Sequence, residues 1–201
     1  MPDAVDRAAR LAAGTEVRLL GLVGAPGVGK STLSTLLSER IGTSMVVVGM
    51  DGFHLANSEL ERLGRRHRKG APDTFDVDGY RTLLRRLHHQ SGPLYAPRFD
   101  RDLEESIGSA ILVQPDVPLV VTEGNYLLHD EHGWSAVRDL LDEIWYLELD
   151  GDERRRRLVE RRLGHGDTPE HAADWVANVD EPNALLIAGT RNRADRIVRM
   201  D

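Results

Sequence analysis

The chain contains no cysteine and only two lysines, Lys30 and Lys69, among its 26 lysine and arginine residues. Without cysteine it can form no disulfide, no thiolate metal site and no cysteine nucleophile. It also lacks any run approaching the roughly 18 consecutive apolar residues of a membrane span, so we expect no membrane partner. Asp3 and Asp6 stand where a secretory signal would carry basic residues, and we therefore expect a cytoplasmic protein.

The chain also has no excess of positive charge, because its 33 acidic residues outnumber the 26 basic ones and give a formal net charge of −7. This balance argues against a protein that holds nucleic acid by its overall field, so we expect no nucleic-acid partner. Hydrophobic residues make up 40% of the chain, which is a globular composition. We expect residues 1–201 to form a single domain, and the sequence leaves a homodimer open.

Short apolar runs recur along the chain, and each is followed by a helical or irregular segment. Continuous rather than alternating apolar character indicates strands buried on both faces, as in a parallel sheet covered by helices. The runs occupy residues 19–23, 45–48, 119–121 and 144–147, with a last strand expected near 196–198. Helical apolar spacing or helix-entry signals mark residues 33–41, 80–87, 152–163 and 169–187. The sequence therefore predicts a three-layer α/β fold with a parallel central sheet and helices on both faces.

Two segments, 52–76 and 91–118, are the least regular and are rich in glycine, proline and charge. We expect long loops there, with Asp76 capping the helix that follows the first of them. Loops of that length in a compact domain are commonly functional, so we expect these two to shape a binding site.

Residues 24–31 read Gly-Ala-Pro-Gly-Val-Gly-Lys-Ser and match the phosphate-binding motif GxxxxGK[ST]. The motif lies directly after an apolar strand and directly before an amphipathic helix, which is the context it requires. Its glycines let backbone N–H groups point into one concavity, and the helix N-terminus adds partial positive charge. The alternative is a glycine-rich turn with an accidental lysine. We expect ATP to be bound by Gly24, Ala25, Pro26, Gly27, Val28, Gly29, Lys30, Ser31 and Thr32.

Two acids follow predicted strands, Asp51 after the second and Glu123 after the third. Because ligands bind at the carboxyl edge of open α/β sheets, both carboxylates are expected near the phosphates. Asp51 can accept a hydroxyl proton or hold a water on Mg²⁺, and Glu123 can orient a magnesium-bound water. Lys30 is expected to reach the β- and γ-phosphates, and the expected metal ligands are Ser31, Asp51 and Glu123. A capping role for Asp51 and a surface position for Glu123 are the alternatives.

Six stretches of the chain match one family, namely residues 24–31, 50–55, 68–76, 95–100, 121–128 and 190–195. The Asp-Gly-Phe-His stretch that begins at Asp51 and the Lys-Gly-Ala-Pro stretch that begins at Lys69 are specific, whereas the first stretch alone is generic. The chain resembles the branch of P-loop kinases that contains bacterial pantothenate kinase, uridine kinase and phosphoribulokinase. It is most similar to the nucleoside/nucleotide kinase-like group with its candidate fructose transport system kinases, although Ala56 replaces the proline usual there.

The resemblance implies a kinase-type P-loop fold with a small lid at about residues 153–170, and it assigns roles to single residues. Asp51 is implied as the catalytic base beside Lys30, and Arg161 and Arg162 as lid arginines that close over the transferring phosphoryl group. A solvated helix face is the alternative for the two arginines, and a packing role for His54. Acceptor contacts are implied for Asp51, His54, Lys69, Tyr95, Arg98, Phe99, Asp100, Glu123 and Tyr126, and adenine contacts for Arg191 and Arg193.

These features together predict an ATP- and Mg²⁺-dependent kinase that transfers the γ-phosphoryl group to a hydroxyl of a small metabolite. A nucleotide-dependent switch and an ATPase without an acceptor are the rival interpretations. A switch needs no base at Asp51 beside an enclosed polar pocket. The acceptor stays open between a nucleoside, a pantothenate-like compound and a sugar.

Overall fold

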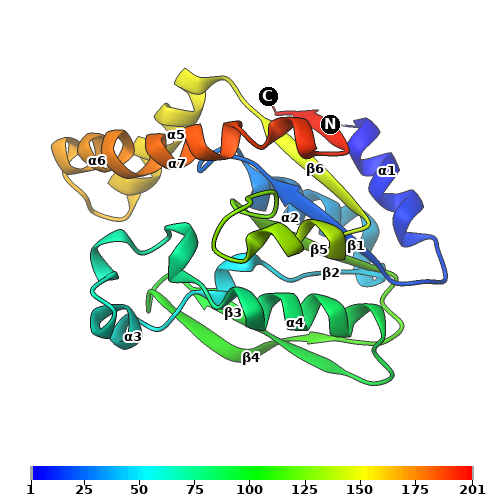
Figure 1. The fold of residues 1–201 in the computed structure, drawn as a ribbon. Helices are drawn as coiled ribbons and strands as arrows, with labels where there is room; N and C mark the ends of the chain where they lie inside the picture. The colour runs from blue at the N-terminus through cyan, green and yellow to red at the C-terminus, as the bar shows by residue number, and fades with distance from the viewer. Residues whose placement is uncertain (1, 201) are drawn as a thin grey trace.

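Five parallel strands form the central sheet in the computed structural model, which describes residues 2–200 (Figure 1). Their order across the sheet is β2–β5–β1–β6–β7, and each strand pairs in parallel with its neighbours. The strands are β1 (Arg18–Val23), β2 (Met45–Val47), β5 (Leu119–Gly124), β6 (Glu143–Glu148) and β7 (Arg196–Arg199). The predicted parallel sheet is confirmed, including its last strand. Five of the six residues of β1 are buried, as expected for a central strand covered on both faces.

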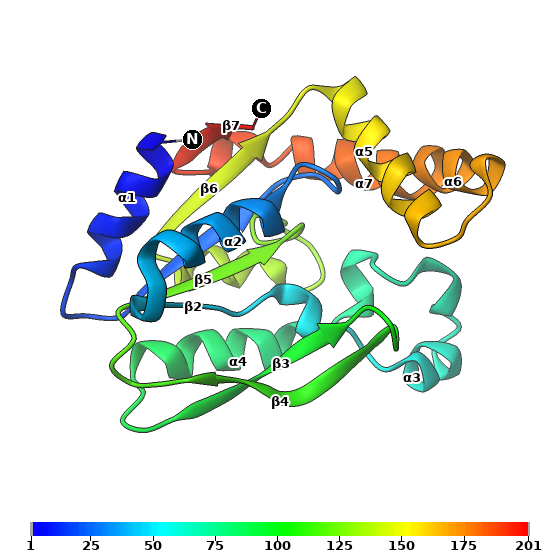
Figure 2. The same cartoon turned by 180° about the vertical axis from the view of Figure 1, so that it is seen from behind.

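Helices cover both faces of this sheet (Figures 1 and 2). One face packs against α1 (Pro2–Ala12) and α2 (Lys30–Ile41), and the buried residues of this layer include Leu33 and Leu37. The other packs against α4 (Val77–His88) and the segment that follows β5, which contributes the fully buried Trp134. The three-layer α/β architecture is therefore confirmed.

Helix α4 shows how local sequence sets an element. Asp76 accepts a hydrogen bond from the backbone N–H of Gly79 at 2.9 Å, so the predicted cap is in place. Its buried face carries Tyr80, Leu84 and Leu87 at helical spacing. Helix α1 was not among the predicted elements, although Ala4, Ala8 and Ala12 recur on its buried face at helical spacing.

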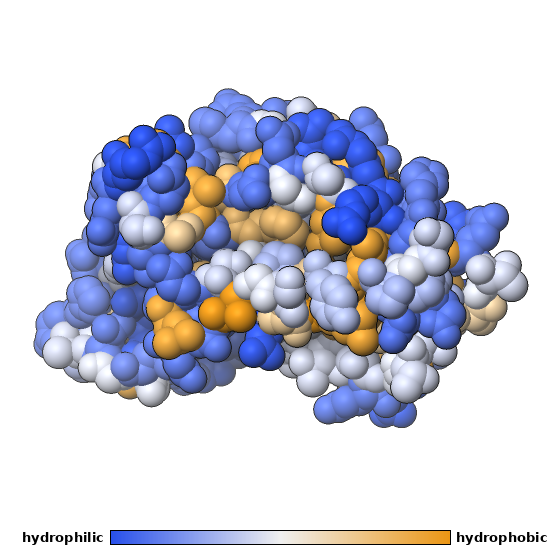
Figure 3. Space-filling view, turned by 90° about the horizontal axis from the view of Figure 1, so that it is seen from below, coloured by the Kyte–Doolittle hydropathy of each residue, from blue (hydrophilic) through white to orange (hydrophobic). Residues whose placement is uncertain are grey.

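The expectation of a long loop over 91–118 was wrong. This segment forms an antiparallel ribbon of β3 (Leu94–Asp100) and β4 (Glu105–Val113), with a register irregularity between Ala96 and Arg98. Much of its outer surface is exposed, so the strands show no long apolar run. From below, apolar residues appear as separate patches among hydrophilic ones (Figure 3). The segment 52–76 is largely irregular as expected, with one short helix, α3 (Asn57–Arg62).

The segment expected to form a lid, at about residues 153–170, and the residues that follow it are largely helical. Helix α5 (Gly151–Gly164) is followed by α6 (Pro169–Trp175), a π-helical turn (Val176–Asp180) and α7 (Glu181–Ala188). The helix predicted over 169–187 is thus present but widened in its middle. Pro182 explains the position of the widening, because proline has no N–H to donate to the preceding turn.

Candidate active site

A cavity of about 430 Å³ opens at the carboxyl edge of the sheet, where the phosphate loop, the segment after β2 and the helices α5 to α7 meet. The parallel pairing sets Leu22 beside Glu123 and Val47 beside Val121, so three strands end close together. Seven of the residues singled out from the sequence for roles beyond the loop backbone line this cavity, namely Lys30, Ser31, Asp51, His54, Lys69, Glu123 and Arg161.

The phosphate loop joins β1 to α2 in the conformation that its glycines require. Gly27 and Gly29 have φ of +79° and +98°, a region that favours glycine. A Cβ on Gly27 would also lie 2.7 Å from the side chain of Leu158 on α5. Helix α2 begins at Lys30, so its free N–H groups face the loop. The loop is therefore shaped to bind phosphate.

The Lys30 ammonium is held by three oxygens. It donates to the carbonyls of Gly24 at 2.8 Å and Ala25 at 3.3 Å, and to Oδ1 of Asn125 at 2.7 Å. Burial lowers the pKa of Lys30 to about 8, although the negative charges of Glu123 and Asp51 oppose the shift. A phosphate that replaced these neutral oxygens would favour the charged form.

Asp51 and Glu123 face the same cavity from neighbouring elements. Asp51 lies in a 3₁₀ turn (Met50–Phe53) directly after β2, and its Oδ2 lies 3.4 Å from a guanidinium nitrogen of Arg101. Burial raises the pKa of Glu123, and the charge of Asp51 raises it further while Lys30 lowers it. The ionisation of Glu123 therefore depends on the charges of both Asp51 and Lys30.

Glycines allow the close approach of these elements. A Cβ on Gly52 would lie 2.5 Å from the carbonyl oxygen of Pro97 in β3, and one on Gly124 would lie 2.6 Å from the sulfur of Met50. The glycine that follows Asp51 thus lets the β3–β4 ribbon pack against the turn that carries this carboxylate.

His54 and Lys69 form one wall of the cavity. His54 contacts the carbonyl oxygen of Asp51 through Nδ1 at 2.8 Å, and its ring lies between Phe75 and Phe99 with centroid distances of 4.1 and 4.7 Å. Burial lowers the pKa of His54, which favours the neutral ring. Lys69 donates to Oδ1 of Asn57 at 2.8 Å and lies 4.9 Å from the centre of the Phe99 ring.

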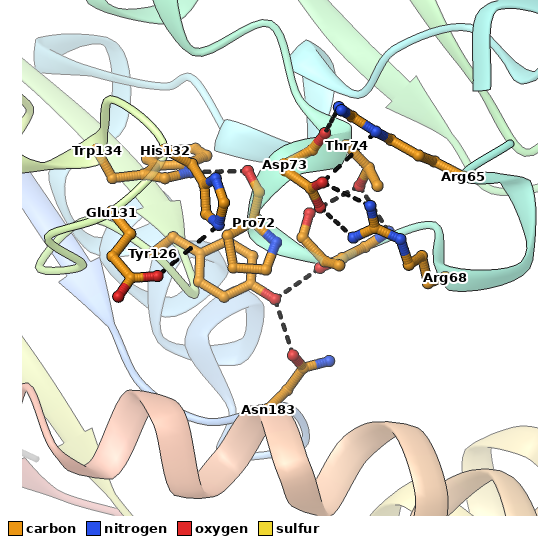
Figure 4. A network of polar contacts seen from close by, with 12 residues as sticks. Arg65, Arg68, Pro72, Asp73, Thr74, Tyr126, Glu131, His132, Trp134 and Asn183 are labelled. Atoms are coloured by element: carbon orange, nitrogen blue, oxygen red, sulfur yellow. Dashed lines mark hydrogen bonds and ion pairs between the residues drawn. The ribbon is translucent and has the colours of Figure 1, made fainter. Parts of the chain in front are cut away.

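Tyr126 is buried behind this wall and links two parts of the molecule (Figure 4). Its hydroxyl donates to the carbonyl of Gly70 at 2.6 Å and lies 3.1 Å from Oδ1 of Asn183 on α7. In the loop that contains Lys69 and Gly70, Asp73 forms ion pairs with Arg65 and Arg68. Tyr126 therefore anchors the Lys69 loop rather than lining the cavity.

The two predicted lid arginines have different positions. Arg161 lines the cavity, and burial lowers its pKa. Arg162 instead pairs with Asp167 at 2.6 Å and lies 4.4 Å from the centre of the Trp175 ring. Arg162 is therefore held by contacts with Asp167 and Trp175 and is not part of the cavity lining.

Outside the phosphate loop, six other predicted site residues are not part of the cavity lining. Tyr95 is 59% exposed, Phe99 packs on His54, and Asp100 accepts hydrogen bonds from the turn after β3. Arg191 pairs with Glu148 at 2.8 Å. The remaining two are Arg98, which is exposed, and Arg193, which donates to the carbonyl of Leu128 at 3.1 Å.

Sequence reasoning missed several cavity residues. Asn125 lies within a stretch that carried the family resemblance, and Arg101 directly follows another, so both could have been found there. Arg157, Asp180 and Asn183 also line the cavity, but they come from helices whose inward face no short motif marks.

The oxygen donors at the site fit magnesium in the presence of a nucleotide. Within residues 2–200, no group of three or more histidine or acidic residues is arranged to hold a metal ion by itself. Ser31, Asp51 and Glu123 supply hydroxyl and carboxylate oxygens to one cavity. Mg²⁺ is commonly bound by one or two carboxylates together with substrate phosphates, so this donor set is suitable.

No helix among the described residues is both long and apolar enough to cross a bilayer.

No protein-family model matches the chain. Comparison with individual proteins is informative. A candidate uridine kinase of Schizosaccharomyces pombe is 36% identical over 181 residues, which cover 84% of this chain and 77% of the relative. A pantothenate kinase of Leifsonia xyli is 29% identical over 91% of this chain and 66% of its own length.

A solved structure is similar over almost the whole chain. The crystal structure of a candidate fructose transport system kinase from Silicibacter sp. TM1040 has a TM-score of 0.89 and 37% identity, and the match covers 98% of both chains. The phosphate loop, the strand order and these relatives agree. The chain therefore belongs to the P-loop kinases, in the branch of uridine kinase and pantothenate kinase, and is an ATP-dependent kinase of small-molecule hydroxyl groups.

Proposed function

We propose that the cavity binds the ATP phosphates on the Lys30 side and the acceptor hydroxyl on the Asp51 side. The observation that supports this most strongly is that Lys30, Ser31 and Asp51 all line one cavity. This cavity lies where three neighbouring parallel strands end. A switch would need no base beside an enclosed polar pocket, so the geometry favours transfer to an acceptor.

Lys30 binds the β- and γ-phosphates in this proposal. Its ammonium leaves Asn125 and the loop carbonyls, and the N–H groups at the start of α2 bind the remaining phosphate oxygens. Arg161, from the lid at about residues 153–170, approaches the transferring phosphoryl group from the other side. Positive charge from both directions offsets the charge on the equatorial oxygens in the transition state.

Asp51 acts as the base. The acceptor hydroxyl gives its proton to the Asp51 carboxylate while its oxygen bonds to the γ-phosphorus, and the bond from that phosphorus to the β–γ bridging oxygen breaks to release ADP. Ser31, Asp51 and Glu123 are the residues that would hold Mg²⁺. When bound, this ion neutralises phosphate charge.

The acceptor occupies the space between Asp51 and the wall formed by His54 and Lys69. The wall is polar and aromatic, which suits a small metabolite with several hydrogen-bonding groups. A nucleoside, a pantothenate-like compound and a sugar remain the proposed classes. The single domain and the cytoplasmic location stay predictions from the sequence, which leaves a homodimer open.

The test is a panel of nucleosides, vitamins and sugars incubated with ATP and Mg²⁺, with ADP production as the measurement. Each compound that stimulates ADP production is repeated with Lys30→Ala and Asp51→Asn. We expect turnover to fall by about 10²- to 10⁴-fold in Asp51→Asn. Undiminished turnover in Asp51→Asn would show that the mechanism is wrong, and stimulation that survives Lys30→Ala would identify a contaminant.

A further inference from the structure

Asp180 is a buried acid at the lid side of the cavity. Its residue is only 7% exposed, it lines the cavity, and its Oδ2 has no hydrogen-bond partner among residues 2–200. Burying a carboxylate oxygen without a partner costs free energy that an asparagine or alanine would avoid. Asp180 therefore does not stabilise the fold through this oxygen, and we look for its role in the active site.

The π-helical turn accounts for the position of Asp180. Four residues of this helical segment, Trp175, Val179, Asp180 and Asn183, line the cavity together. Asp180 is the last residue of the turn Val176–Asp180, two residues before Pro182. Single π-turns within α-helices are frequently found at functional sites. The widened turn is therefore the device that brings this carboxylate into the cavity.

Burial raises the pKa of Asp180, and the positive charges of three arginines, Arg161, Arg162 and Arg154, oppose this shift. Arg154 is buried, donates to the carbonyl of Pro26 at 3.3 Å and pairs with Glu181. Arg162 pairs with Asp167 and packs on the Trp175 ring. Arg161 is the one of the three that lines the cavity with Asp180.

Charges of both signs act on Arg161 in the cavity. Burial disfavours its charge, and the like charges of Arg101 and Arg162 do so as well, whereas Asp180 and Asp51 act in the opposite sense. Without Asp180, desolvation and repulsion would favour an Arg161 side chain that turns out to solvent.

We propose that Asp180 is a positioning residue that holds the Arg161 guanidinium toward the phosphoryl group in transfer. The proposal rests on the role given to Arg161 in the proposed function. A fixed guanidinium stabilises transition-state charge without reorganising during the reaction, whereas a mobile one does so less well. Asp180 itself touches neither the nucleotide nor the acceptor in this proposal.

The experiment compares the affinity of the protein for Mg²⁺–ADP with and without aluminium fluoride, which mimics the transferring phosphoryl group. The ratio of the two dissociation constants is measured by calorimetry for the wild type, Arg161→Gln, Asp180→Asn and the double variant. Because the ratio is taken within each variant, a partial loss of folded protein cancels. Asp174→Asn, an exposed acid of the preceding helix α6, is the matched control.

We expect Arg161→Gln and Asp180→Asn each to lower the ratio by about tenfold or more, with no further loss in the double variant and no change in Asp174→Asn. Thermal unfolding of Asp180→Asn is expected at an equal or higher temperature than that of the wild type, which a purely structural residue would not show. A normal ratio in Asp180→Asn with a lowered ratio in Arg161→Gln would overturn the positioning role alone. A normal ratio in Arg161→Gln, or no fluoride effect in the wild type, would instead overturn the proposed function.

Discussion

The ammonium of Lys30 lies 2.7 Å from Oδ1 of Asn125, which connects the phosphate loop directly to the end of the neighbouring strand β5. Asn125 follows Gly124, the residue paired in register with the last residue of β1. The neutral amide can hold the lysine in place and still be displaced by a phosphate, because a charged acceptor makes the stronger hydrogen bond.

Replacing the amide by a carboxylate should oppose that exchange. We expect Asn125→Asp to weaken ATP binding by about tenfold, because the new charge competes for Lys30 and repels the γ-phosphate. Asn125→Ala, which removes the amide without adding charge, is the control and should change the affinity less. The measurement is calorimetric titration with a non-hydrolysable ATP analogue, and equal affinities in the two variants would contradict the prediction.

The affinity for nucleotide should depend on pH through Lys30. The pKa of this lysine is about 8 in the free protein because of burial, and the phosphates of a bound nucleotide raise it. A group with a higher pKa in the bound state strengthens binding below its free pKa, and this advantage is lost as pH rises. We therefore expect the dissociation constant of an ATP analogue to rise by up to about tenfold between pH 7 and pH 9.

Proton uptake on binding at pH 9, measured in buffers of different ionisation enthalpy, checks the same point. In Lys30→Arg the guanidinium stays charged over this range, so the dependence should disappear. A wild type whose affinity is constant to pH 9 would show that Lys30 is not the titrating group.

Glu123 should lower the stability of the folded protein although it contributes to the active site. Burial raises its pKa above the ordinary value, so the folded state binds this proton more tightly than the unfolded chain. Stability from this proton is present at low pH and lost as pH rises through the folded pKa. We expect Glu123→Gln to unfold at a higher temperature than the wild type at pH 7, with a smaller difference at pH 4.

Thermal unfolding followed by circular dichroism is the measurement, and the exposed Glu39→Gln is the control, with no change expected. Phosphoryl transfer by Glu123→Gln should fall even though the protein is more stable. A variant that is both less stable and fully active would contradict both statements.

Gly52 offers a test of how the ribbon supports the site. A Cβ at this position meets the backbone carbonyl of Pro97 at 2.5 Å, and backbone cannot move aside as a side chain can. We expect Gly52→Ala to lower the free energy of unfolding by about 1–3 kcal/mol and to reduce turnover, because Asp51 is displaced with its turn.

The matched control is Gly108→Ala on β4 of the same ribbon, where a Cβ meets nothing within 4 Å. Urea unfolding of both variants is the measurement. Equal stabilities would show that the ribbon adjusts freely around Gly52.

The sequence by itself determined the phosphate loop, the parallel strands and the acids at their ends. The motif that ends in Lys30 and Ser31 consists of consecutive residues, so the backbone conformation of its own glycines largely determines its shape. Strands buried on both faces leave continuous apolar runs, and parallel strands place their carboxyl ends at one edge. The position of Asp51 and Glu123 after two such runs is therefore enough to assign both acids to the same edge of the sheet.

Only the tertiary structure decided which side chains face the cavity. Arg161 and Arg162 are adjacent in sequence, yet one lines the cavity and the other packs on Trp175, because successive helical residues point in different directions. The β3–β4 ribbon and the turn that carries Asp180 could not be predicted, because neither leaves a clear local signal in the sequence. An exposed ribbon lacks a continuous apolar run, and a π-turn depends on the packing of a whole helix as well as on Pro182.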